Sequence, residues 1–255
     1  MDATTPRIAL ITGASRGLGR SMALHLADAG VDVVGTYRQN EAEAAAVARD
    51  VESRGRRAAM LPLDVGRSDT FAAFADALAG VLQRTFGRPT FDYLVNNAGS
   101  AVYGSIADTR EADFDAMVNE HLKGPFFLTQ RLLPLLADGG RVLNVSSGLT
   151  RITFPGRAAY ASLKTGVETF TRYLAKELGP RRITANVIAP GAIATDFGGG
   201  TVRDNPEVNQ AIAGMTALGR VGRPEDVGAA VAALLSDGMG WMNGVRVEVS
   251  GGQGL

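Results

Sequence analysis

The sequence predicts a single α/β domain built around a parallel, doubly wound sheet. Two observations lead to this prediction: short apolar runs rich in β-branched residues alternate with longer stretches of helical spacing, and a glycine-rich loop joins the first run to the first helical stretch. A third is the length, because 255 residues suffice for one hydrophobic core that buries about three quarters of the unfolded chain's surface. No linker interrupts the pattern, so we expect one domain over residues 1–255.

Each expected strand is an apolar run of strand length, and each expected helix is a longer stretch in which apolar residues recur at helical spacing. In chain order, strands are expected over residues 7–11, 31–37, 57–63, 91–95, 141–146, 183–189 and 245–249. Helices are expected over residues 18–29, 41–54, 68–86, 111–136, 158–178 and 225–235. Local signals support these boundaries, since Ser68 suits a helix N-cap, Pro224 suits a first turn and Gly30 suits a helix end.

The composition excludes several classes of protein. The 26 basic residues balance 26 acidic residues, so no nucleic-acid partner is expected. Cysteine is absent and the only histidines are His25 and His121, so we expect neither disulfides nor a metal site. No apolar run approaches the roughly 18 residues of a membrane span, and the N-terminus lacks the pattern of a secretory signal. We therefore expect a cytoplasmic protein with no membrane partner.

A glycine-rich loop follows the first expected strand, with the sequence Thr-Gly-Ala-Ser-Arg-Gly-Leu-Gly over residues 12–19. Glycines at such a turn let the backbone approach a pyrophosphate, whose charge is stabilised by the N–H groups at the helix N-terminus. The spacing differs from the common Gly-x-Gly-x-x-Gly pattern, and an ordinary strand-to-helix turn is the alternative. The candidate cofactor-binding residues here are Gly13, Ser15, Arg16, Gly17, Leu18 and Gly19.

The end of the second expected strand indicates which dinucleotide fits. An acidic residue there would bind the ribose hydroxyls of NAD, whereas arginine accommodates the additional phosphate of NADP. The strand ends in Arg38 with no acid, and Arg16 in the glycine loop provides a second cation. These residues favour NADP(H), and two solvated arginines are the alternative.

Tyr160 and Lys164 are four residues apart in an expected helix, so both side chains lie on one face. A lysine charge about 5 Å from a tyrosine would lower the tyrosine pKa by about two units, which would make Tyr160 a general acid near neutral pH. Ser147 follows the fifth expected strand and could orient a carbonyl against Tyr160. A serine that merely ends a strand is the alternative for Ser147.

Together these motifs resemble those of the short-chain dehydrogenase/reductase family, over essentially the whole chain. The matching residues are the glycine loop, Asp64-Val65, Asn96 to Gly99, Ser147, Tyr160 with Lys164, Pro190-Gly191 with Thr195, Gly244 and Gly251-Gly252. The resemblance implies a Rossmann-type sheet with strand order 3-2-1-4-5-6-7, a nicotinamide cofactor and a homotetramer.

The resemblance also implies roles for single residues. The tyrosine would donate the proton, Lys164 would also hold the nicotinamide ribose, Thr195 would anchor the carboxamide end and Asp64 would contact adenine. The further cofactor-binding residues that the resemblance implies are Asp64, Val65, Asn97, Ala98, Gly99, Tyr160, Lys164, Pro190, Gly191, Ile193 and Thr195.

One departure from the family pattern concerns the residue before Leu122, which is usually asparagine and here is His121. Asn119 lies two positions too early to replace it. In the family, the asparagine helps to hold a water that links the active-site lysine to solvent, so we expect His121 within a water's reach of Lys164. An imidazole that titrates near pH ~6.5 could serve as the same relay and add a pH dependence of its own. A passive substitution is the alternative.

The function expected from these motifs is the reversible, NADPH-dependent reduction of a ketone to a secondary alcohol. An NAD-dependent alcohol dehydrogenase and a catalytically silent dinucleotide-binding sensor or scaffold are the alternatives. The segments expected to line the substrate pocket are residues 149–155 and a lid at about 196–215, and both are largely apolar, which favours a hydrophobic small-molecule carbonyl or alcohol. The family also contains reductases of 3-oxoacyl groups on a carrier protein, but residues 132–136 lack a basic cluster that would meet an acidic carrier.

Overall fold

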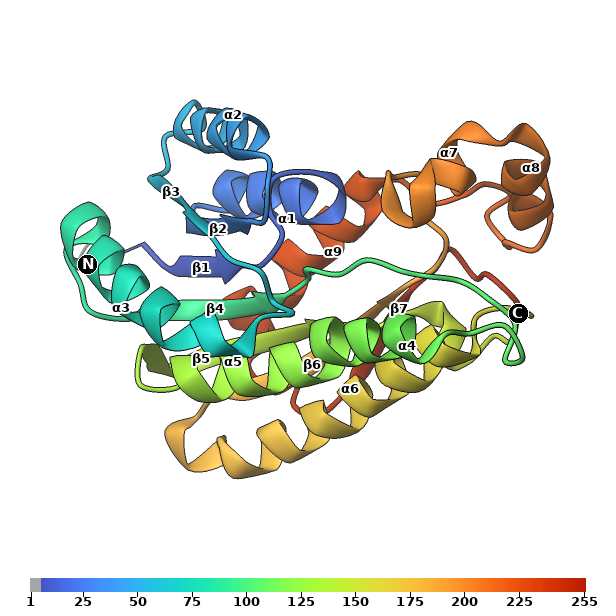
Figure 1. The fold of residues 1–255 in the computed structure, drawn as a ribbon. Helices are drawn as coiled ribbons and strands as arrows, with labels where there is room; N and C mark the ends of the chain where they lie inside the picture. The colour runs from blue at the N-terminus through green and yellow to red at the C-terminus, as the bar shows by residue number, and fades with distance from the viewer. Residues whose placement is uncertain (1–5) are drawn as a thin grey trace.

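One seven-stranded sheet runs through the centre of the computed structural model, which describes residues 6–255 (Figure 1). The strand order is β3-β2-β1-β4-β5-β6-β7, and every neighbouring pair is parallel. The strands are β1 (Ile8–Ile11), β2 (Asp32–Tyr37), β3 (Ala58–Pro62), β4 (Phe91–Asn96), β5 (Leu136–Val145), β6 (Thr184–Pro190) and β7 (Arg246–Val249). The predicted α/β class, the parallel doubly wound sheet and its strand order are confirmed.

Helices cover both faces of the sheet, as Figure 1 shows. The helices are α1 (Gly17–Asp28), α2 (Glu41–Glu52), α3 (Phe71–Val81), α4 (Glu111–Val118), α5 (Gly124–Leu132), α6 (Ala158–Glu177), α7 (Thr201–Asp204), α8 (Pro206–Gly214) and α9 (Pro224–Leu234). Strand β1 shows why two layers are needed. All four of its side chains are fully buried, and because successive side chains point to opposite faces, Ile8 and Leu10 pack under α3 and α5 while Ala9 and Ile11 pack under α1 and α9.

The region expected as one helix over 111–136 differs from the prediction. Helix α4 passes through a π-helical turn over Asn119–Lys123 into α5, and β5 already begins at Leu136. The chain is closely packed where this turn ends, because a Cβ on Gly124 would lie only 2.2 Å from the Val65 carbonyl oxygen. Turns of this type change the direction of a helix and occur frequently at functional sites.

The segment expected as a lid contains helices that the sequence analysis did not predict. Helix α8 begins where the Asn205 side chain accepts hydrogen bonds from the backbone N–H groups of Glu207 and Val208, with Pro206 in the first turn. Helices α7 and α8 stand away from the sheet, beyond its carboxyl edge (Figure 1). Within residues 6–255, no helix is long and apolar enough to cross a membrane.

A buried hydroxyl fixes the ends of β1 and β4 relative to each other. The Thr12 side chain is 1% exposed, and its Oγ1 accepts hydrogen bonds from the N–H groups of Asn97, at 2.9 Å, and Ala98, at 3.0 Å. The Asn97 amide in turn donates to the carbonyl oxygens of Thr12 and Gly13. The glycine loop and the segment after β4 therefore form one connected unit at the carboxyl edge of the sheet.

Replacing Thr12 by valine keeps the shape of the side chain but removes the acceptor of two buried N–H groups. Each unsatisfied buried polar group costs about 1–3 kcal/mol, so we expect the free energy of unfolding to fall by about 2–5 kcal/mol in urea denaturation. Thr70→Val is the matched control, because the Thr70 hydroxyl is exposed, and it should change the free energy by less than about 0.5 kcal/mol. Equal effects of the two substitutions would contradict the role of Thr12.

Candidate active site

The N-terminus of α1 has the features of a phosphate cradle. No side chain caps this helix end and no acidic residue lies in its first turn, which leaves its backbone N–H groups for an anionic ligand. Gly13 has φ +67°, and a Cβ on Gly19 would lie 2.1 Å from the Gly13 carbonyl oxygen. Only glycine permits this close approach of loop and helix, so the residues present fit the pyrophosphate of a dinucleotide.

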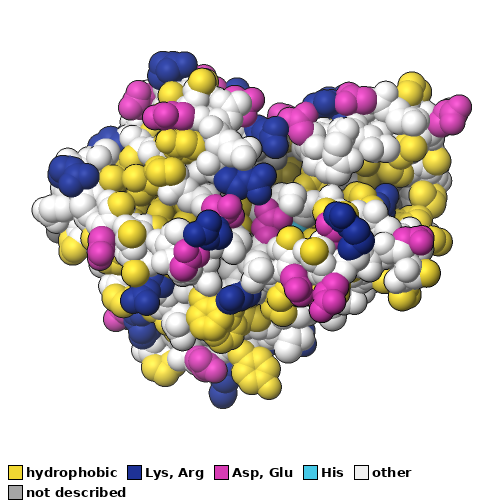
Figure 2. Space-filling model, viewed as in Figure 1, with side chains coloured by type: hydrophobic (Ala, Val, Ile, Leu, Met, Phe, Trp, Pro, Cys, Tyr) yellow, Lys and Arg dark blue, Asp and Glu magenta, His cyan; other side chains and the backbone are white. Residues whose placement is uncertain are grey.

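The segment after β6 forms the opposite wall of this cradle. A Cβ on Gly17 would lie 3.9 Å from Cβ of Thr195, which is buried and accepts a hydrogen bond from the Phe197 N–H. Ile193, expected to bind cofactor, pairs with Gly222, while Gly191 donates its N–H to Val249. Figure 2 shows the surface hollowed between the part that carries α1 and α2 and the part that carries α7 and α8.

The residues expected at the adenosine end follow neighbouring strands. Arg38 is exposed after β2, Asp64 follows β3 and accepts the Gly66 N–H at 2.9 Å, and Val65 is buried. The side-chain amide of Asn97 donates hydrogen bonds to the glycine loop, and its contact with a cofactor stays a prediction. Basic and acidic side chains are interspersed on the face shown in Figure 2.

Tyr160 and Lys164 project from α6 toward the end of β5. The Lys164 ammonium donates a hydrogen bond to the Val145 carbonyl oxygen at 2.9 Å and lies 5.5 Å from the centroid of the Tyr160 ring. Ser147 comes two residues after β5 ends, and its Oγ accepts the Leu149 N–H at 3.2 Å. That bond leaves the Ser147 hydroxyl proton to be donated to a ligand.

Burial determines the protonation of Tyr160. The phenolate would be desolvated, and Tyr103 and Glu120 add to this, so the pKa of Tyr160 is raised above its ordinary value of 10. The expected fall of this pKa is not found, because desolvation of the buried phenolate outweighs the effect of the neighbouring Lys164, whose own pKa falls to about 8 through burial. At neutral pH Tyr160 is therefore a neutral phenol, the form that can donate a proton.

His121 lies in the π-helical turn, against the ring of Tyr160. The two rings meet edge to face with centroids 5.1 Å apart, and the His121 Nε2–H donates to the Ser100 carbonyl oxygen at 2.5 Å. Burial and the nearby Lys164 charge lower the pKa of His121 to about 3. The expected titration near pH ~6.5 is therefore wrong. Among residues 6–255, no hydrogen bond joins this ring to Lys164, and its buried Nδ1 has no partner.

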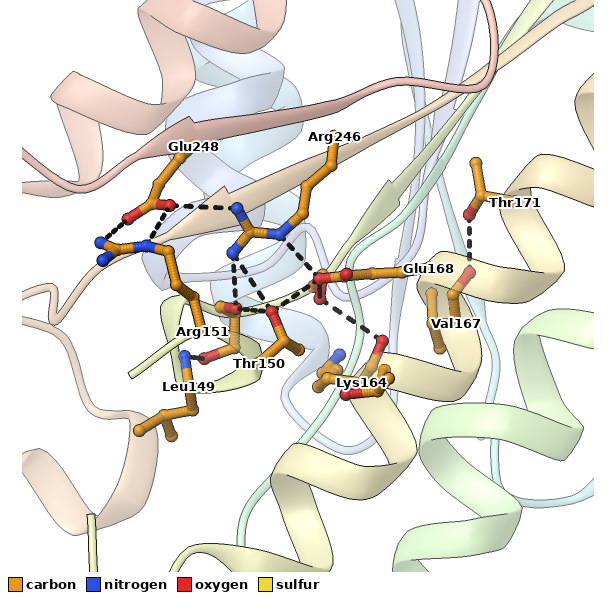
Figure 3. A network of polar contacts seen from close by, with 12 residues as sticks. Leu149, Thr150, Arg151, Lys164, Val167, Glu168, Thr171, Arg246 and Glu248 are labelled. Atoms are coloured by element: carbon orange, nitrogen blue, oxygen red, sulfur yellow. Dashed lines mark hydrogen bonds and ion pairs between the residues drawn. The ribbon is translucent and has the colours of Figure 1, made fainter. Parts of the chain in front are cut away.

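A network of polar side chains behind Ser147 was not predicted (Figure 3). The Glu168 carboxylate accepts hydrogen bonds from Ser146, Thr150 and Arg246 at 2.7–2.9 Å. Arg246 also donates to the Ser147 carbonyl oxygen and pairs with Glu248. The network ties the Ser147 loop to α6 and β7. A signal was present in the sequence, because Glu168 continues the spacing of four that links Tyr160 and Lys164.

Two further aromatic rings enclose Tyr160, which is 6% exposed. The centroid of Tyr103, which precedes α4, is 6.3 Å from that of Tyr160 at an angle of 82°. The centroid of Phe197, at the start of the expected lid, is 5.9 Å away at 58°. Tyr103 lies far from the motifs in the sequence, so no local pattern indicated it.

The fold and the site define an oxidoreductase that binds a dinucleotide at the carboxyl edge of a parallel sheet. A family model described as enoyl-(acyl carrier protein) reductase matches residues 13–253. An NADPH-dependent aldehyde reductase-like chloroplastic protein of Arabidopsis thaliana is 38% identical, with 96% of this chain and 93% of the relative covered. The chain belongs to the short-chain dehydrogenase/reductase family.

Two other similar proteins have names that mention a substrate or a ligand. A hydroxynaphthalene reductase-like protein, Arp2, of Metarhizium brunneum is 34% identical over 96% of this chain and 94% of its own length. The structure of the angucycline C-6 ketoreductase LanV with bound NADP superimposes with a TM-score of 0.92 at 35% identity, covering 97% of this chain and 95% of that one.

The low pKa of His121 predicts how acid destabilises the protein. Between pH 6.5 and about 3 the unfolded chain binds a proton at His121 that the folded chain does not, so the unfolding free energy falls as the pH falls through this range. Between pH 7 and pH 4.5, we expect the unfolding free energy of His121→Asn to fall by about 2–3 kcal/mol less than that of the parent protein, measured by urea denaturation. The assignment would be contradicted if the unfolding free energy fell equally in the parent and in His121→Asn. It would also be contradicted if His25→Asn reduced this fall as much as His121→Asn does.

Proposed function

We propose that this chain reduces a ketone to a secondary alcohol with NADPH, and that Tyr160 is the proton donor. The observation that carries the proposal is the neutral, buried phenol of Tyr160 beside Lys164, next to a loop suited to a pyrophosphate. The NADPH-dependent and NADP-bound proteins among the similar proteins support the choice of cofactor. Arg16 and Arg38 and the absence of an acid at the end of β2 support it as well.

NADPH, when bound, would supply the hydride for the carbonyl carbon, and Tyr160 would donate its proton to the carbonyl oxygen. The developing alkoxide is a stronger base than a phenolate, so the neutral phenol of Tyr160 can protonate it. The Ser147 hydroxyl donates to the same oxygen and aligns it. Lys164, held by Val145, favours the transient phenolate that the transfer leaves. The reversal of these steps would oxidise the alcohol.

We propose a fused-ring aromatic ketone as the substrate class. The hydroxynaphthalene reductase-like relative supports this choice by its name, and the aromatic rings around Tyr160 support it by their chemistry. Residues 196–215, which include α7 and α8, would form the lid over this substrate. The reduction of a 3-oxoacyl group is the second candidate, because the matching family model is described by acyl carrier protein chemistry.

The activity is tested by NADPH oxidation with 2-tetralone, an aliphatic ketone and a 3-oxoacyl thioester, each against a control without ketone. We expect turnover with 2-tetralone, and we expect Tyr160→Phe to abolish it while folding and NADPH binding persist, because only the proton donor is removed. Substantial turnover in Tyr160→Phe would identify another acid. No NADPH oxidation with any of the three compounds would refute the proposed function.

Cofactor choice is tested with Arg38→Asp. Charge-assisted hydrogen bonds to a phosphate contribute about 1.5–3 kcal/mol, so we expect kcat/KM for NADPH to fall at least about tenfold while that for NADH changes little. Steady-state kinetics with both cofactors provide the measurement. Equal losses for NADPH and NADH would exclude Arg38 from the recognition of the 2′-phosphate.

We further propose that the protein is a homotetramer, while its cytoplasmic location remains a prediction. Phe126 and Phe127 on α5 are 43% and 41% exposed, and Tyr173 on α6 is 65% exposed, which suits helices that pack against another copy. Light scattering at micromolar concentration should give the mass of four 26.6 kDa chains. A monomer mass would refute the assembly.

A further inference from the structure

We propose that Tyr103 and Phe197 are the specificity-determining walls of an aromatic slot, in which Tyr103 is fixed and Phe197 moves to admit a flat aromatic ketone. This inference rests on the proposed function for the role of Tyr160. It goes further by assigning the recognition of the substrate to two residues outside the catalytic group. It also states which of the two moves.

The packing around Tyr160 requires a substrate to meet these two rings. Tyr103 contacts one side of Tyr160 and Phe197 contacts another, while His121 covers a third side and is held by Ser100. A carbonyl oxygen must reach the Tyr160 hydroxyl to receive its proton. Because the rings together leave Tyr160 only 6% exposed, the substrate has to replace at least one of the contacts.

Tyr103 is held in place from two directions. The Arg157 guanidinium lies 3.3 Å from the centroid of its ring, in a cation–π contact. The neighbouring backbone is tied to the same segment, because the Gly104 N–H donates to the Gly156 carbonyl oxygen at 3.1 Å. The loop before α4 and the loop before α6 therefore clamp Tyr103 as one wall.

Phe197 is placed on a segment that can change direction. It is 39% exposed, and the next three residues, Gly198, Gly199 and Gly200, all have positive φ angles of 62°, 76° and 75°. Three consecutive glycines have the widest choice of backbone conformations, which suits a hinge. The wall at Phe197 can therefore withdraw while the wall at Tyr103 stays.

The chemistry of the slot favours flat aromatic molecules. Aromatic rings prefer offset-stacked or edge-to-face contacts, and an aryl ketone can make them with both Tyr103 and Phe197. A saturated ring system of the same size has no π face and is puckered. Its binding is therefore stabilised only by the burial of its apolar surface. The slot should discriminate between two ketones that differ in this property alone.

The kinetic experiment compares 2-tetralone with 2-decalone, which have the same carbon skeleton, by kcat/KM with NADPH. We expect the parent enzyme to prefer 2-tetralone, and we expect Tyr103→Leu and Phe197→Leu each to reduce the preference by about threefold to tenfold. Tyr103→Phe and Phe197→Tyr retain the rings and should keep it within about twofold. Arg157→Met, which releases Tyr103, should behave like Tyr103→Leu. The control is Trp241→Leu, which removes a fully exposed aromatic ring outside the site and should leave the preference unchanged.

An unchanged preference in both leucine variants would overturn the proposal. A loss in Tyr103→Phe as large as that in Tyr103→Leu would also overturn it, because the hydroxyl rather than the ring would then discriminate.

A binding experiment separates this inference from the proposed function. The protein with bound NADPH, which cannot oxidise an alcohol, is titrated with 2-naphthol and with decahydro-2-naphthol by calorimetry, and its hydrogen exchange is followed in the presence of each. We expect tighter binding of 2-naphthol, lost in the two leucine variants, and slower exchange over residues 197–204 with unchanged exchange over 101–105. If no ketone is reduced but this pattern is found, the proposed function fails and the slot stands. Equal binding of the two alcohols, or altered exchange at 101–105 alone, would refute the slot.

Discussion

The candidate site depends on one interaction, the hydrogen bond from the buried Lys164 ammonium to the carbonyl oxygen of Val145. A charged amine without a partner in this position would be costly, and the last residue of a central strand provides the acceptor. That requirement fixes α6 against β5, and it brings Tyr160 to the end of the strand that Ser147 follows. Burial lowers the pKa of the neighbouring His121, and the Lys164 charge adds to this shift.

The carboxylate of Glu168 extends this organisation away from the reacting atoms. It joins Ser146 and Thr150, which lie in the loop after β5, to Arg246 on β7. Arg246 also donates to the Ser147 carbonyl oxygen and pairs with Glu248. Glu248 pairs in addition with Arg151, which donates a hydrogen bond to the backbone near the C-terminus. Each acceptor in the chain has a donor, so the network holds the Ser147 loop without an unpaired buried charge.

The sequence alone predicted the parallel sheet and the edge where the site lies, because strand length, helical spacing and the glycine loop are local patterns. The strand order followed from the resemblance to the family. The sequence could not predict the sign of the pKa change at Tyr160. The spacing of four places a lysine near the tyrosine, but the burial that raises the pKa comes from Tyr103, Phe197 and Met117, which are distant in sequence. The break in the expected 111–136 helix was missed for the same reason. Gly124, where α5 begins, packs against the Val65 carbonyl oxygen, and helical periodicity does not reveal such a contact.

The contact between Gly99 and His121 restricts the order in which this site can change during evolution. A Cβ on Gly99 would lie 2.6 Å from the His121 Cε1 atom, so no larger residue fits at 99 while the imidazole stays. A smaller residue at 121 would remove the obstacle and open space next to the Tyr160 ring. The two positions are therefore coupled in one direction: a mutation at 121 can come first, whereas a mutation at 99 is tolerated only on the background that the first one creates. A chain that keeps histidine at 121 in this position therefore requires glycine at 99.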